Sequence, residues 1–331
     1  MKILFVFTGG TIGTTESGGV RSADPCKPYK IISAYKSRYG IDFEYDTKEP
    51  YNELSENNTG LNISALVRCV AESLSGGYDG IVVTHGTDTL QYSASALGYC
   101  LGSSTPPICL VSSNAPIEDE SSNALINLRG AIRFIEEKAG SGVFSVYSNK
   151  GGSVNVHRGT RLIGPKAYSD ASYSIFGQIY ASFDESFGYH KNAAYSERAD
   201  DVEPFGCVSL SETNEATLVI SPYPGMVYPK LPSGIKYVIL NTYHSGTVNT
   251  KSEAAREFFL SAKEKGITVF ATGIEEGVSY ESMSIFEELG ITPVKNLSPI
   301  AAYMKLWLAD SIGLSPISVL DRSLAGDIAD S

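Results

Sequence analysis

Runs of apolar residues that end in glycine-rich turns with hydroxyl groups occur twice in the first part of this 331-residue chain. Residues 5–7 (Phe-Val-Phe) lead into residues 8–13 (Thr-Gly-Gly-Thr-Ile-Gly), and residues 81–83 (Ile-Val-Val) lead into residues 84–89 (Thr-His-Gly-Thr-Asp-Thr). Each run predicts a buried strand followed by a sharp turn. Open α/β sheets bind ligands at the carboxyl ends of their strands, so these two turns are the first candidates for a functional site.

Segments with apolar residues at helical spacing alternate with strand-like runs through the next hundred residues. The expected helices cover residues 62–75, 88–100 and 122–137, and a further short strand covers residues 107–111. Asp88 and Gln91 have the form of a capping box that opens the second of these helices. Strands and helices in alternation predict a doubly wound, mostly parallel sheet.

The pattern changes to strict alternation over residues 143–163, around an Asn-Lys-Gly-Gly segment that is typical of a hairpin. Residues 14–24 are small and polar, and we expect them to form a loop that closes over a site.

The last third of the chain repeats the alternation of strands and helices on a smaller scale. We expect strands at 217–221, 237–241 and 267–271, a helix opened by Thr250 and Glu253 as a capping box, and another helix starting at Ser298. Residues 184–216 are rich in charged and small polar residues and show no sustained period. We therefore predict a large α/β domain over 1–190, a linker over 191–216 and a smaller α/β domain over 217–331.

Composition narrows the class of protein. An apolar content of 42% is that of a globular chain, and a net charge of −11 opposes binding to nucleic acid or to an anionic membrane. The amino terminus runs directly into the first turn, which leaves no room for a signal segment. Five widely spread cysteines without a Cys-x-x-Cys pair are typical of reduced thiols, so we expect a cytoplasmic protein.

The two turns do not resemble nucleotide sites or metal sites. Neither turn has the Gly-Lys-Ser/Thr ending of a phosphate-binding loop, and the first lacks the dinucleotide fingerprint. The four histidines show no metal-ligand spacing, so we expect no metal and no cofactor. A threonine hydroxyl such as that of Thr11 becomes nucleophilic only beside a base or a cation, and the alternative role for Thr11 is to support the turn.

Taken together, residues 8–13 and 85–89 resemble the two signatures of the bacterial-type L-asparaginase family, and the layout of the chain is most similar to the cytoplasmic type I branch. The resemblance implies that Thr11 attacks the side-chain amide of L-asparagine, that ammonia leaves, and that water then releases L-aspartate. It also implies a homodimer or homotetramer whose only other partner is a small amino-acid substrate.

The resemblance assigns further catalytic roles. Thr87 and Asp88 correspond to the second reactive pair of the family, and Lys166 is the lysine expected to complete it, with a pKa that burial can shift. The alternative role for Asp88 is a helix cap, and for Lys166 it is that of an ordinary surface lysine.

The resemblance also assigns substrate-binding residues. Ser55 and Glu56 are in the place where the family holds the α-carboxylate and the α-amino group, and their residue types suit that task. The alternative is that both are solvated loop residues. Gly10 and Gly86 belong to the turns whose backbone N–H groups are natural donors to an oxyanion.

One departure from the family pattern keeps other functions open. The family usually has a tyrosine about a dozen residues past the first threonine, whereas residues 17–21 read Ser-Gly-Gly-Val-Arg and the next tyrosine is Tyr29. Tyr29 or Glu16 is a candidate substitute. The alternatives are an amidohydrolase for glutamine, a D-amino acid or another small amide, and a protein that binds or senses an amino acid without hydrolysing it.

Overall fold

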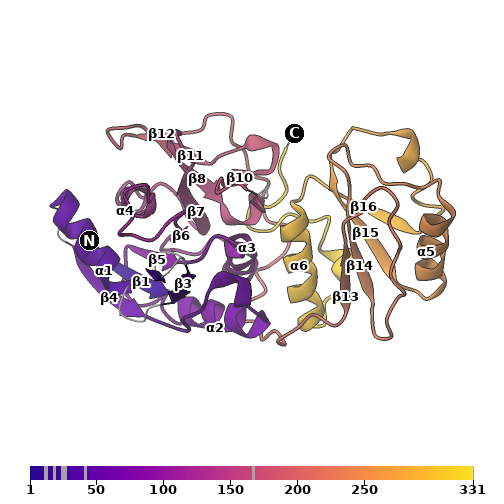
Figure 1. The fold of residues 1–331 in the computed structure, drawn as a ribbon, viewed down its shortest axis with the longest axis horizontal. Helices are drawn as coiled ribbons and strands as arrows, with labels where there is room; N and C mark the ends of the chain where they lie inside the picture. Colours follow the sequence, from indigo (N-terminus) through magenta and orange to yellow (C-terminus); the bar gives the residue numbers. More distant parts are fainter. Residues whose placement is uncertain (11–13, 18–19, 24–27, 41–42, 166–167, 331) are drawn as a thin grey trace.

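The computed structural model describes residues 1–10, 14–17, 20–23, 28–40, 43–165 and 168–330. Figure 1 shows two α/β regions side by side, a larger one with the amino terminus and a smaller one, with helix α6 (Pro299–Ser311) between them.

The larger region is built on an eight-stranded sheet. From one edge to the other its strands are β12 (Tyr189–Lys191), β11 (Ala181–Phe183), β8 (Val154–Arg158), β7 (Val143–Ser148), β6 (Ile108–Val111), β5 (Gly80–Thr84), β1 (Lys2–Phe7) and β4 (Glu44–Lys48). The five strands from β7 to β4 are parallel, and β8, β11 and β12 continue the sheet antiparallel. The predicted mostly parallel sheet is thereby confirmed, and β7 and β8 form the expected hairpin.

Helices cover both faces of this sheet. One face packs against α1 (Pro28–Tyr39) and α4 (Ala124–Glu136), and the other packs against α2 (Gly60–Ala71) and α3 (Leu90–Leu101). Alternate side chains of β1 belong to the two cores, with Phe5 in the first and Leu4 in the second. The doubly wound arrangement follows from this strand, which is apolar and buried from Ile3 to Phe7, because neither of its faces can be left to water.

The strand order reverses between β1 and β5. From β1 the chain goes outward to β4, returns past β1 to β5, and then continues in the opposite direction to β6 and β7. A reversal of this kind opens a crevice at the carboxyl ends of the two strands where the order changes. The two glycine turns predicted from the sequence follow these two strands.

The smaller region has a four-stranded parallel sheet in the order β13 (Thr217–Ile220), β14 (Tyr237–Asn241), β15 (Thr268–Ile274) and β16 (Ile291–Lys295). Helix α5 (Glu253–Glu264) packs on one face through residues such as Phe259. Residues 192–216 contain no helix or strand, so the chain passes between the regions as a segment of turns and irregular structure. The division into domains at 191–216 remains a prediction.

Helix α6 and the segment after it join the two regions. Met304 and Leu308 of α6 share one core with residues of α2, α3, β14 and β15. Beyond α6 the chain returns to the larger region, where Asp327 pairs with Lys305 of α6 at 2.7 Å, with both side chains fully buried. The hydroxyl of Tyr99, on α3, donates to the same carboxylate at 3.0 Å.

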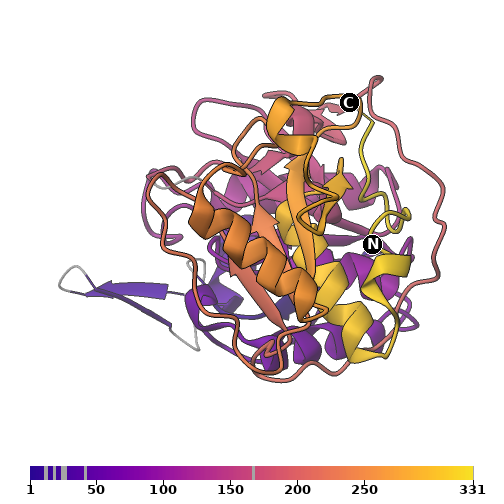
Figure 2. The ribbon, with the colours of Figure 1, turned by 90° about the vertical axis from the view of Figure 1, so that its right-hand side faces the viewer.

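Short elements complete the fold. They are β2 (Thr14–Ser17), β3 (Val20–Ala23), β9 (Leu162–Ile163), β10 (Tyr173–Ser174) and the 3-10 turns Ser55–Asn57, Gly159–Arg161, Ile175–Gly177, Glu281–Met283 and Pro316–Ser318. Strands β2 and β3 pair antiparallel, whereas the sequence indicated a loop over this part of the chain. Figure 2 shows these two strands extending away from the rest of the molecule.

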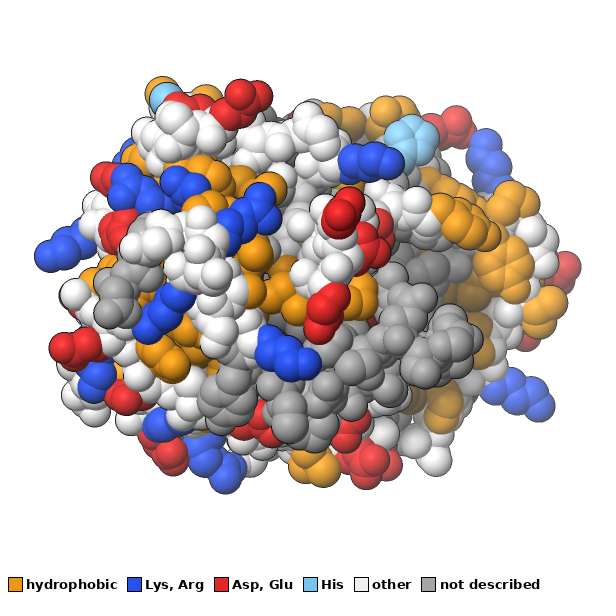
Figure 3. Space-filling view, turned by 60° about the vertical axis from the view of Figure 1, so that its left-hand side comes forward, with side chains coloured by type: hydrophobic (Ala, Val, Ile, Leu, Met, Phe, Trp, Pro, Cys, Tyr) orange, Lys and Arg blue, Asp and Glu red, His pale blue; other side chains and the backbone are white. Residues whose placement is uncertain are grey.

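The surface carries charges of both signs. On the face shown in Figure 3, acidic and basic side chains are interspersed and do not form a single basic patch. Among the helices of the described segments, none is long and apolar enough to cross a bilayer.

Candidate active site

The first turn follows β1 and lies against the segment around Glu53. The amide of Gly10 donates to the Glu53 carbonyl at 3.0 Å, and the amide of Glu53 donates to the Thr8 carbonyl at 3.1 Å. Gly9 and Gly10 have φ of 95° and 78°, in the left-handed region that favours glycine. Because the Gly10 N–H already has a partner, its use by a substrate would require replacing that hydrogen bond.

The second turn follows β5 and is in direct contact with the first. A Cβ added to Gly10 would lie 2.3 Å from the backbone nitrogen of Gly86, far inside van der Waals contact. The Thr8 hydroxyl donates to the Thr84 carbonyl at 2.8 Å, which ties the ends of the two strands together. The turns therefore meet at the point where the strand order reverses.

Ser55 and Asp88 form the next layer of the site. The Ser55 hydroxyl accepts from the Asp88 amide at 3.2 Å and donates to the Asp88 carboxylate at 3.3 Å. Ser55 is buried, and its Oγ would lie 2.4 Å from a Cβ added to Gly86. A serine hydroxyl and a carboxylate thus lie beside the contact of the two glycines, where they can bind polar groups of a small molecule.

This arrangement corrects the expected start of the helix. Helix α3 begins at Leu90 with Thr89 as its N-cap, and the Asp88 carboxylate makes no capping bond to it. Gln91 instead donates to the Asp88 carbonyl at 2.8 Å. The capping-box prediction is wrong because Ser55, 33 residues earlier in the chain, engages the Asp88 side chain.

His85 supports the second turn from behind. Its ring is fully buried, with Nδ1 2.8 Å from the Gly86 carbonyl oxygen and Nε2 2.8 Å from the Ser93 hydroxyl. Since a carbonyl oxygen only accepts, Nδ1 carries the proton and Nε2 accepts from Ser93. Burial lowers the pKa of His85 to about 4, which keeps the ring neutral near pH 7.

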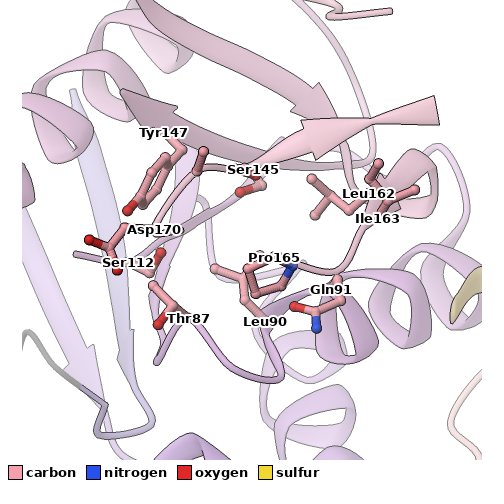
Figure 4. Close-up of a pocket in the computed structure, with 12 residues that line it drawn as sticks. Thr87, Leu90, Gln91, Ser112, Ser145, Tyr147, Leu162, Ile163, Pro165 and Asp170 are labelled. Carbon is pink, nitrogen blue, oxygen red and sulfur yellow. The ribbon is translucent and has the colours of Figure 1, made fainter. Parts of the chain in front are cut away.

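Thr87 opens into a pocket on the other side of the turn. Figure 4 shows its hydroxyl-bearing side chain below Ser112, with Tyr147 and Asp170 further along the same wall and Leu162 and Ile163 opposite. Ser112 follows β6, whereas Ser145 and Tyr147 belong to β7. The pocket thus collects hydroxyl groups from the carboxyl ends of successive parallel strands and one acidic side chain.

The structure brings together Gly10, Ser55, Gly86, Thr87 and Asp88 from three separate segments of the chain. Glu56 is exposed at the edge of this group. Thr11 and Lys166 lie outside the described residues.

Sequence reasoning missed the deeper wall of the pocket. Tyr147, Ser145 and Asp170 lie in segments that were recognised only as a hairpin and its continuation. The available signal was positional, since polar residues at the carboxyl end of any strand in a parallel sheet face the same edge. Within the described segments, no three histidine, cysteine, aspartate or glutamate side chains are grouped as metal ligands.

Comparison with known proteins adds family information. The family model described as "Asparaginase, N-terminal" matches residues 2–175. An L-asparaginase from Thermococcus kodakarensis is 27% identical over the full length of both chains. One of the subunits of a glutamyl-tRNA(Gln) amidotransferase, from Haloquadratum walsbyi, is 28% identical over 98% of this chain and 75% of its own length.

Solved structures show the same fold. The thermostable L-asparaginase from Thermococcus kodakarensis superposes with a TM-score of 0.80 at 24% identity and covers 100% of both chains. L-asparaginase I from Vibrio cholerae superposes with a TM-score of 0.74 at 20% identity, covering 99% of each chain.

Proposed function

We propose that this chain, which belongs to the asparaginase family, hydrolyses L-asparagine to L-aspartate and ammonia through a threonyl ester. The observation that carries the proposal is the contact of Gly10 with Gly86 at the crevice of the sheet, with Ser55 and Asp88 beside it and Thr87 facing a pocket. A full-length relative named L-asparaginase supports the choice of substrate.

In the proposed mechanism the Thr11 hydroxyl attacks the carboxamide carbon and loses its proton. The nitrogen takes up a proton and leaves as ammonia, which gives an ester of Thr11. Water then attacks the ester carbon, so that aspartate leaves and the Thr11 hydroxyl is restored. Thr11 is assigned as the nucleophile from its position in the first signature. A threonine hydroxyl needs an activating neighbour, and the residues of the second signature are the proposed source of that activation.

The proposed neighbours are Thr87, Asp88 and Lys166. Lys166 would be held by Asp88 and would pass protons to and from Thr87, in keeping with the use of a lysine as an acid and base in a partly dry site. The position of Thr87 in the lining of the pocket supports this role, and the role of Lys166 comes from the family resemblance.

Ser55 and Glu56 are proposed to bind the amino-acid end of the substrate. The Ser55 hydroxyl lies at the glycine contact, where it can donate to the α-carboxylate in place of Asp88, and the Asp88 carboxylate released from it can pair with the α-ammonium group. Glu56 is exposed and would add a second acid for the ammonium group.

Release of ammonia from L-asparagine by the purified protein tests the proposal directly. The wild-type chain should release ammonia, and Thr11→Ala and Thr87→Ala should each reduce the rate by about 100-fold or more, the scale on which proton transfer and nucleophilic activation contribute. Ser318→Ala, far along the chain on an exposed turn, serves as the control. Unchanged activity in both threonine variants would end the assignment.

Glutamine is the second candidate substrate. Several relatives are named as subunits of glutamyl-tRNA(Gln) amidotransferases, including one from Pyrobaculum aerophilum at 26% identity over 92% of this chain. Rates measured on L-asparagine, L-glutamine, their D-forms and other small amides decide between these substrates. A protein that only binds or senses an amino acid would instead show a rise in melting temperature with aspartate and no ammonia from any amide.

We further propose a cytoplasmic homodimer or homotetramer. The four cysteines in the described part of the chain form no disulfide, as expected in a reducing compartment. Light scattering of the purified protein gives the number of protomers, and a monomeric mass would contradict the assembly.

A further inference from the structure

A buried hydroxyl without a partner lies in the pocket beside Thr87. The side chain of Tyr147 is 3% exposed, and its hydroxyl has no hydrogen bond to any described residue. The nearby Asn123 side chain donates to the Ser148 carbonyl at 2.9 Å and accepts from the Asn114 amide at 3.0 Å. An unsatisfied buried hydroxyl destabilises the protein, and a ligand that supplies the missing partner removes that cost.

An acidic side chain lies next to that hydroxyl. Figure 4 shows the Tyr147 hydroxyl directed toward the Asp170 carboxylate, with Ser112 between this pair and Thr87. Burial raises the pKa of Tyr147, the Asn123 side chain opposes part of this rise, and the charge of Asp170 adds to it. The phenol therefore keeps its proton at neutral pH and can donate it in a hydrogen bond, whereas the neighbouring carboxylate can only accept.

This pair of groups matches one kind of ligand. A primary carboxamide has a carbonyl oxygen that accepts and an NH₂ group that donates, so it can bond to both side chains at once. A carboxylate has acceptors only, and its negative charge is repelled by Asp170. A substrate that spans the turn can place its amino-acid end at Ser55 and Asp88 and its amide end in the pocket.

We propose that Tyr147 and Asp170 are the residues by which the site distinguishes a carboxamide substrate from the carboxylic acid that hydrolysis produces. The inference rests on the proposed function and extends it to product release. Hydrolysis converts the group in the pocket from a neutral amide into a carboxylate anion. The carboxylate has no N–H to donate to Asp170, and its negative charge is repelled by the charge of Asp170. The acid is thereby driven out of the pocket.

Two single-atom variants test the two contacts separately. Tyr147→Phe removes one hydrogen bond and should raise KM for the amide by about three- to ten-fold, the effect of one bond to a neutral group. Asp170→Asn removes an exposed charge and should tighten L-aspartate binding by about two- to five-fold. The affinity for aspartate is measured by calorimetry and by product inhibition.

Matched controls come from the same chain. The Tyr189 hydroxyl is also buried without a partner in the described residues but belongs to the core behind the sheet, so Tyr189→Phe should leave KM unchanged. Asp321 is an exposed acid on the segment after α6, so Asp321→Asn changes the net charge equally and should leave aspartate binding unchanged. Tyr147→Phe should unfold at the same temperature as the wild type or higher, because the lost hydroxyl had no partner.

The outcomes separate this inference from the proposed function. If the wild type releases ammonia and both pocket variants keep its KM and its aspartate affinity, the inference is overturned while the function stands. If the wild type releases no ammonia from any amide but Asp170→Asn still tightens aspartate binding, the enzymatic proposal fails and the pocket assignment is supported. If neither amide nor acid binds the wild type, the pocket assignment is overturned as well.

Discussion

Two buried histidines should make the stability of this protein depend on pH near neutrality. Burial lowers the pKa of both His85 and His157 to about 4, against an ordinary value of 6.5 in the unfolded chain. The stability is therefore fully present above pH 6.5 and decreases as the pH falls toward 4, because the unfolded state takes up protons that the folded state refuses. Between pH 7.5 and pH 5 each histidine should lower the free energy of unfolding by about 2 kcal/mol.

His157 allows the cleaner test, because it lies outside the candidate active site. Its Nδ1 is 2.8 Å from the Ser174 hydroxyl, and its Nε2 has no partner among the described residues. His157→Asn keeps a polar group for Ser174 but cannot titrate. Urea denaturation should then show a loss between pH 7.5 and pH 5 that is about 2 kcal/mol smaller than in the wild type.

The control variant keeps the imidazole of His157 and removes the hydroxyl of Ser174 that contacts it. Ser174→Ala lowers stability at every pH but should retain the full pH-dependent loss, because His157 remains buried. The reasoning is refuted if His157→Asn loses as much stability between the two pH values as the wild type does, since His157 would then titrate in the folded protein as it does in the unfolded chain.

Two further predictions concern close packing and buried charge. Gly86→Ala places a methyl group 2.4 Å from the Ser55 hydroxyl oxygen. It should lower the free energy of unfolding by about 1–3 kcal/mol and abolish aspartate binding. Gly152→Ala is the control and should do neither, because its added Cβ meets its nearest atom at 3.4 Å. Lys305→Met leaves the Asp327 carboxylate buried without its cation and should cost about 3–5 kcal/mol in urea denaturation. The double variant Lys305→Met/Asp327→Asn should recover part of that loss, and equal losses in the single and double variants would contradict the account.

Local patterns predicted much of the fold and only part of the site. The apolar runs at residues 5–7 and 81–83 became β1 and β5, and the alternation over 143–163 became the hairpin of β7 and β8. The residues that cap the helices were less predictable. Helix α5 is capped by Ser252 rather than Thr250, and the Ser252 hydroxyl accepts from the Ala255 amide at 3.3 Å. Neighbouring hydroxyl residues compete for such a position, and small differences in packing decide between them.

Contacts between distant segments could not be read from the sequence. Arg161 is fully buried and donates to the carbonyls of Gly326 and Ile328 near the end of the chain. Nothing in the sequence around Arg161 marks it as buried, because its partners lie elsewhere in the chain, two of them backbone oxygens 165 and 167 residues away. Tyr147 escaped prediction for the same reason, since its significance depends on what lies across the pocket.

The meeting of the two turns follows from the register of the strands that carry them. Phe7 pairs with Thr84 in the parallel ladder of β1 and β5, so both strands end at the same level and the glycines that follow arrive together. A shift by one residue would move one turn by about 3.3 Å along the strand and turn every side chain of that strand to the opposite face. Phe5 and Leu4 pack in different cores and resist such a shift through their size and shape. The apolar pattern of β1 therefore does more than build a core, since it also fixes the distance at which Gly10 meets Gly86.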